Sequence, residues 1–258
     1  MMKTKIWILA LALLSATSAA GRHGLWRDRV LQNVTYRAIL GYELGGTMPL
    51  HIPASIRGLN EFKFTPNFIA GVEMEKPVEG SPWVLKAALQ FENKGMSLDS
   101  KVKNHHETVE RGGEVLEGVF VGDVNVQVTQ WMVTVPVLLA YHVSDRVFLE
   151  TGPYISFLTS RDFHGWAHNG YLRVGDPTGP KVEMGETKTE RGNYDFSADM
   201  RRVQMGIAMG ASWHFSNRMG AFAHFTLGFN GIFKSGFTAM GQTLHPVYGQ
   251  FGLSYKLK

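Results

Sequence analysis

Residues 131–141, WMVTVPVLLAY, decide the fold of this chain. Every second residue from Trp131 to Tyr141 is a large apolar one, and the residues between them are of mixed character. A two-residue period is that of a β-strand whose two faces meet different surroundings. Ten residue steps of about 3.3 Å, tilted by about 40°, rise roughly 25 Å, which is the height of the lipid-facing band of an outer-membrane barrel. The stretch therefore predicts a membrane-spanning strand.

The same alternation recurs along the chain. Residues 83–91 and 203–215 again separate large apolar residues from small or polar ones. The chain also carries 29 Gly, 16 Phe, 8 Tyr and 6 Trp, which combines a weak helix former with strong strand formers. Five further segments follow the pattern less regularly: 34–43, 64–75, 147–158, 221–232 and 247–257. Eight strands are predicted.

The connections between these strands alternate in length. Three are short and rich in turn residues, at 75–82, 143–146 and 216–218. The others are long and polar, near 44–63, 95–122, 161–198 and 233–246. Such loops are unusual in a compact soluble domain, whereas an outer-membrane barrel has short periplasmic turns and long extracellular loops. Residues 34–258 are therefore predicted to form an all-β, eight-stranded, up-and-down antiparallel transmembrane β-barrel.

Residues 1–20 have the build of a cleaved signal peptide, with two lysines, an apolar run and small residues before the expected cleavage point. Residues 21–33 then form a periplasmic N-terminal segment. The expected location is the outer membrane of a Gram-negative bacterium, where the apolar face of the barrel contacts lipid. The formal net charge of +4 comes without a basic stripe interleaved with aromatics, so a nucleic-acid partner is not expected.

Residues 136–158, PVLLAYHVSDRVFLETGPYISFL, resemble the outer-membrane β-barrel domain family that is common in Bacteroidetes and often labelled PorT-like. Pro136, Tyr141 and the LETGPY stretch at 149–154 carry this resemblance, and residues 206–232 look like a later hairpin of the family. The resemblance implies an outer-membrane barrel that assists type IX secretion.

The C-terminal residues are predicted to form the closing strand of the barrel. They also resemble the pattern that the barrel assembly machinery recognises, with Gln250, Gly252, Tyr255 and Leu257 at the matching positions. This machinery is therefore an expected partner.

Charged and imidazole side chains alternate onto the inner face of the predicted strands. A bare charge in a narrow interior is costly, so these groups are expected to neutralise one another as a structural polar network, with a narrow ion or small-solute channel as the alternative. The network residues are Arg37, Glu73, Lys86, Glu150, His142 and His214.

Aromatic residues on the outer face are expected at the headgroup levels of the membrane. This predicted girdle consists of Trp83, Phe91, Trp131, Tyr141 and Trp213.

Two further groups of residues are candidates for chemistry. The pairs His105, His106 and His164, His168 lack a complete ligand set, so solvated histidines and no metal or cofactor are predicted. Inward Ser212, His214 and Ser254 leave a lipid-modifying enzyme as an alternative, but no nucleophile-elbow motif accompanies them. The favoured function is a non-enzymatic membrane scaffold, whose loops 95–122 and 161–198 are candidate surfaces for a secretion-system or extracellular partner.

Overall fold

The structure is a computed structural model that describes residues 33–50, 53–240 and 242–257. The chain divides into two units, Met1–Val34 and Thr35–Lys258, and every strand described below lies in the second. The predicted signal peptide and all but the last residue of the predicted segment 21–33 lie outside the described residues.

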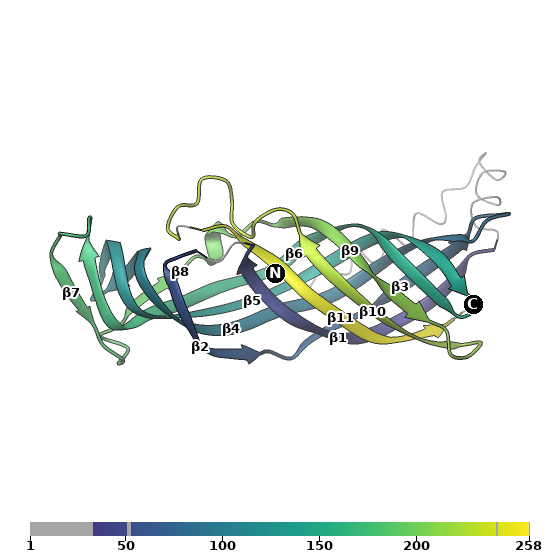
Figure 1. The fold of residues 1–258 in the computed structure, drawn as a ribbon, viewed down its shortest axis with the longest axis horizontal. Helices are drawn as coiled ribbons and strands as arrows, with labels where there is room; N and C mark the ends of the chain where they lie inside the picture. The colour runs from purple at the N-terminus through teal and green to yellow at the C-terminus, as the bar shows by residue number, and fades with distance from the viewer. Residues whose placement is uncertain (1–32, 51–52, 241, 258) are drawn as a thin grey trace, which may run out of the picture. The chain divides into compact units, whose positions relative to one another are not determined.

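Eight antiparallel strands form a closed ring (Figure 1). Around the ring the order is β4-β3-β1-β11-β10-β9-β6-β5, and pairing between β5 and β4 closes it. The strands are β1 Thr35–Pro49, β3 Asn67–Pro77, β4 Trp83–Arg111, β5 Glu114–Ser144, β6 Val147–Val174, β9 Val203–Trp213, β10 Met219–Gly228 and β11 Leu244–Lys256. The predicted eight-stranded barrel, closed by its C-terminal strand, is confirmed.

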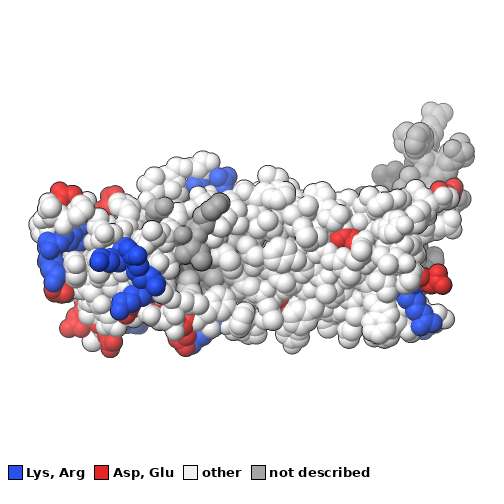
Figure 2. Space-filling view, in the orientation of Figure 1, with Lys and Arg blue, Asp and Glu red and all other residues white. Residues whose placement is uncertain are grey.

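The faces of the ring follow the predicted alternation. In β5, Thr134, Leu138 and Ala140 are buried inside the ring, while Leu139 and Tyr141 are exposed on its outer wall. Figure 2 shows an outer wall almost free of charge between two ends that carry Lys, Arg, Asp and Glu. This distribution fits a wall that meets hydrocarbon.

The prediction of a long loop at residues 95–122 is wrong. β4 continues to Arg111 and β5 begins at Glu114, so this region is a hairpin whose turn, Gly112–Gly113, has φ values of +63° and +86°. β6 likewise continues to Val174 within the predicted loop 161–198. Beyond the membrane the outer face meets water, so polar residues point outward and the apolar residues change to the inner face.

We call this extension the arm. It comprises residues 95–130 and 159–200 together with β2 (Ile56–Phe64), which pairs with β4. β7 (Lys181–Met184) pairs with β6, and β8 (Gly192–Asp195) pairs with both β6 and β4. A 3₁₀ helix, η1, follows at Ser197–Asp199. Among the described residues, no helix is long and apolar enough to cross a membrane.

The largest apolar core of the described chain lies in the arm and in the adjoining end of the ring. It packs the inner faces of β4, β5 and β6 against Phe196 and Met200, which flank η1, and against the segment between β10 and β11. We call it the apolar cluster; its buried members include Met96, Val102, Val109, Phe120, Val124, Val128, Phe163, Leu172, Tyr194, Met200, Phe233 and Leu244.

The β1–β11 seam places Gly41 opposite Gly252. A Cβ on Gly252 would collide with the backbone of Leu40 and Gly41, which cannot move without opening the seam. We therefore expect Gly252→Val to abolish the heat-modifiable gel migration of the folded barrel, because overpacking at a fixed backbone costs about 1–3 kcal/mol or more.

The matched control is Gly58→Val in β2, where nothing lies within 4 Å of the added Cβ. It should leave gel migration unchanged. Normal folding of Gly252→Val would show that the seam tolerates a side chain.

Candidate functional site

Lys86 is the centre of a buried charge cluster near the end of the barrel that carries the short turns. Its Nζ lies 2.8 Å from Glu150 Oε2, 3.2 Å from Glu75 Oε1 and 3.5 Å from Glu73 Oε1. It also donates a hydrogen bond of 3.0 Å to Ser212 Oγ. Three carboxylates from β3 and β6 therefore share one ammonium group from β4.

Arg37 and two histidines extend this cluster, which we call the basal cluster. Arg37 Nε donates to Glu75 Oε2 at 2.9 Å, and Arg37 Nη2 lies 3.2 Å from His214 Nδ1. On the other side, His224 Nε2 lies 2.6 Å from Glu150 Oε1. The basal cluster thus consists of Arg37, Glu73, Glu75, Lys86, Glu150, Ser212, His214 and His224.

Five of the six predicted network residues meet in the basal cluster. The exception is His142, which is half-buried and packs its ring 4.2 Å from that of Phe148. Glu75 was missed because it stands where the predicted strand 64–75 meets the predicted turn 75–82, whereas β3 continues to Pro77 and pairs Glu75 with Lys86. His224 was also missed, although it continues the inward alternation of β10.

A second buried cluster, the central cluster, lies farther along the interior. Lys94 Nζ is 2.9 Å from Glu92 Oε1, to which Thr134 Oγ1 donates at 2.6 Å. Gln250 Nε2 donates to Glu43 Oε1 and, at 3.3 Å, to Glu92 Oε2. The sequence prediction missed Glu92 and Lys94 because it ended this strand at residue 91, although the two-residue period continues through both.

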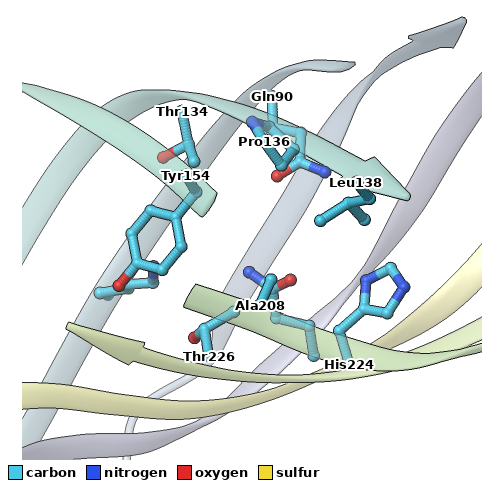
Figure 3. Close-up of a pocket in the computed structure, with 10 residues that line it drawn as sticks. Gln90, Thr134, Pro136, Leu138, Tyr154, Ala208, His224 and Thr226 are labelled. Atoms are coloured by element: carbon cyan, nitrogen blue, oxygen red, sulfur yellow. The ribbon is translucent and has the colours of Figure 1, made fainter. Parts of the chain in front are cut away.

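Little space remains between the two clusters. Figure 3 shows a cavity lined by Gln90, Thr134, Tyr154 and His224, and its volume is only about 10 Å³. A second cavity of about 10 Å³ lies within the basal cluster. Each holds about one water molecule, so side chains fill the described interior as expected for eight strands.

The polar interior ends at the apolar cluster. Along β5 the inward residues are Thr134, Met132 and Gln130, and from Val128 onward they are apolar. Gln204 Nε2 donates to Gln130 Oε1 at 2.6 Å, and this amide pair lies at the border. The arm end of the interior is therefore closed by apolar side chains.

Residues 30–234 match the family described as outer membrane protein beta-barrel domain. The chain belongs to this family. Membership places the barrel in the outer membrane, where its outer wall contacts lipid.

The solved structures that the chain matches have little sequence in common with it. Ail, the attachment invasion locus protein of Yersinia pestis, has 7% identity and a TM-score of 0.40, and the match covers 88% of this chain and 100% of Ail. The translocator domain of the autotransporter NalP from Neisseria meningitidis has 12% identity and a TM-score of 0.24, over 98% of this chain and 96% of that domain. No curated protein matches the chain.

The predicted girdle residues all lie on the outer wall of this outer-membrane barrel. Trp83 packs edge-on against Tyr141 with ring centroids 4.9 Å apart, and Phe91 stacks on Trp131 at 5.3 Å. Trp213 is exposed at the turn end of β9. Their anchoring role at the headgroups stays a prediction.

The predicted assembly-signal residues belong to the closing strand or follow it. Gln250, Gly252 and Tyr255 lie in β11, and Leu257 follows it with its backbone N–H bonded to Tyr36 O at 2.8 Å. Gln250 also belongs to the central cluster. Recognition by the assembly machinery stays a prediction.

The histidines predicted to be solvated have partners instead. His105 is buried in β4, 3.4 Å from Glu107, and His168 Nε2 lies 2.9 Å from Asp99. His106 and His164 contact Glu117 and Asp162. For His105 and His168 the prediction of solvated loop histidines was wrong, because these segments are strands, whereas the side chains of His106 and His164 are 41% and 45% exposed. The described residues contain no group of three metal ligands.

The inward serines do not form a nucleophile–base pair in the described structure. Ser212 accepts a hydrogen bond from Lys86, and His214 contacts Arg37 and Glu75 rather than Ser212. This arrangement uses both groups to stabilise buried charge.

Glu107 is a buried carboxyl in the arm, beyond the membrane-spanning part of β4. It is fully buried, and neither carboxyl oxygen has a hydrogen-bond partner. Burial raises the pKa of Glu107 to about 8. Burial and His106 lower the pKa of neighbouring His105, and burial raises the pKa of Tyr194 well above 10.

We expect Glu150→Ala to destabilise the barrel by about 3–5 kcal/mol, since it leaves the buried Lys86 and His224 without their nearest carboxylate. The control Glu117→Ala removes an exposed carboxylate and should cost less than about 1 kcal/mol. Urea unfolding followed by gel migration would measure both. Equal stability of the two variants would contradict the polar network.

The arm should lose stability as pH rises. Folded Glu107 keeps its proton up to about pH 8, whereas the unfolded chain releases it near pH 4.5, so stability falls across this window by about 1.4 kcal/mol per pH unit. Hydrogen exchange of arm amides between pH 7 and 8, corrected for intrinsic rates, would measure this loss. Glu107→Gln should flatten the dependence; an unchanged slope would rule out Glu107 as its source.

Proposed function

We propose that the protein is a non-enzymatic outer-membrane scaffold that holds the arm outside the cell as a binding surface. The observation that carries this proposal is that β4, β5 and β6 run without interruption from the membrane-spanning ring into the arm. The apolar cluster and the pairing of β8 with β4 and β6 fix the arm further. A surface built on continuous strands is presented in one orientation, which lowers the entropy cost of binding.

The outer face of the arm has the composition of a recognition surface. Arg191 stacks over Trp166 at 4.0 Å, and Lys181 lies 4.4 Å above the ring of Tyr171. Aromatic residues and arginine are enriched at protein interfaces, where rigid rings contribute much of the contact energy. Lys and Arg gather at this end of the molecule in Figure 2.

A secretion partner belongs to the same proposal. The resemblance to PorT-like barrels makes the type IX secretion machinery one candidate for the arm's partner, through the surfaces within 95–122 and 161–198. Recognition of the C-terminal strand by the assembly machinery is proposed on the match at Gln250, Gly252, Tyr255 and Leu257.

The filled interior argues against the alternative of a narrow channel. The cavities of about 10 Å³ are too small for a hydrated ion path, and the apolar cluster closes the arm end. Discrete conductance steps of the purified protein in a planar bilayer would favour the channel and contradict the closed scaffold.

Single-cysteine labelling tests the presentation of the arm, because the chain contains no cysteine of its own. Val115, at the hairpin tip, is 72% exposed. On intact cells, a membrane-impermeant maleimide should label Val115→Cys but not Ser81→Cys in the turn between β3 and β4. Labelling of Ser81→Cys alone would reverse the proposed orientation.

A further inference from the structure

A hollow of about 520 Å³ opens on the outer wall where β5, β6 and β9 lie side by side. The residues that line it come from these three strands and from the two residues after β10. Most of the lining side chains are apolar, namely Val135, Val137, Pro153, Ile155, Met205 and Phe229; Tyr154, Gly206 and, at the rim, Asn230 complete the lining.

The hollow coincides with a gap in the ladder between β5 and β6. Pro136 pairs with Tyr154 and Leu139 pairs with Thr151, but no pairing to β6 is formed by the two residues between, Val137 and Leu138. Pro153, opposite Val137, has no N–H to donate. The proline ring and the valines on β5 extend only a short distance from the backbone toward lipid. The longer side chains of neighbouring Met205 and Phe229 extend farther, so a hollow remains between them.

The polar groups at the rim are already used. Asn230 Oδ1 accepts from the backbone N–H of Met205 at 2.8 Å, and Asn230 Nδ2 donates to Val203 O at 2.9 Å. The hollow therefore offers no side-chain partner to a polar ligand. A hydrocarbon chain is the chemistry that it fits.

The hollow is also sealed from the interior. Leu138, Tyr154 and Ala208 form a small buried apolar group on the inner side of the same strands, and Figure 3 shows their side chains in the interior of the barrel. A chain in the hollow is thus separated from the basal and central clusters.

The position of the hollow along the outer wall places it in one leaflet of the membrane. Val137 and Pro153 lie near the middle of the spanning parts of β5 and β6, whereas Met205 and Phe229 lie at the arm ends of β9 and β10. The hollow therefore extends from mid-membrane toward the arm, within the band that contacts lipid.

We infer that this hollow binds one acyl chain of a lipid in the leaflet on the arm side, as a fixed site distinct from the mobile lipid around the rest of the wall. The assignment of that leaflet as the outer one rests on the proposed function. Because the hollow is continuous with the lipid-facing wall, acyl chains of the surrounding lipid can enter it directly.

Photo-crosslinking tests the site. The full-length protein is reconstituted in phosphatidylethanolamine liposomes that contain a phosphatidylglycerol with a diazirine on one acyl chain, and the crosslinked residues are identified by mass spectrometry. Crosslinks to Pro153, Ile155 and Met205 should exceed those to exposed Leu40 on the opposite wall at least fivefold. The probe is in both leaflets, so this result does not depend on the orientation tested by cysteine labelling.

Val137→Phe should reduce these crosslinks at least fivefold by filling the hollow, and Val135→Phe gives a second filling variant if the first does not fold. The matched control is Val72→Phe, because Val72 and Val137 are exposed to similar extents, 44% and 42%, on different strands. Crosslinks spread evenly over the wall, or unchanged crosslinks in a folded filling variant, would overturn the proposal.

Discussion

Hydrocarbon offers no hydrogen-bond partner to a peptide group, and the rest of the structure depends on this constraint. A sheet with an open edge would leave a row of N–H and C=O groups unpaired, so β1 and β11 must meet. In so small a ring, neighbouring backbones leave no room for a Cβ at several inward positions, and at the seam these positions are Gly41 and Gly252. The same closure leaves a narrow interior that side chains must fill.

The interior is arranged in the reverse of a soluble domain. Within the membrane, the barrel is filled by ion pairs around Lys86 and Lys94, because apolar side chains are stable facing lipid. Beyond the membrane, water surrounds the strands and the apolar cluster occupies their inner side. One set of strands therefore contains two cores of opposite character. The border lies near Gln130, where the environment of the outer face changes from hydrocarbon to water.

This change explains what the sequence could and could not predict. The alternation in 131–141 indicated the strand and its lipid-facing side, because a single environment covers that whole stretch. Residues 123–129 alternate equally well, but with the apolar residues at even positions, and the polar residues between them favoured a loop. Glu75, Glu92 and Lys94 were missed because Glu75 lies at the expected end of one strand and Glu92 and Lys94 lie just past the expected end of the next. The ion pair between Lys86 and Glu150 also depends on the ring order, since it joins strands that are distant in the sequence.

The unbroken passage of β4 and β5 from the membrane into the arm also has a mechanical consequence. A partner that pulls on the hairpin tip applies its force along the strands. The hydrogen bonds between strands lie across this direction, so the force is distributed over many of them as shear. Many of these bonds must break together before one strand slides past its neighbour. The arm can therefore transmit tension to the membrane-embedded ring without unfolding in between, as a hinged loop could not.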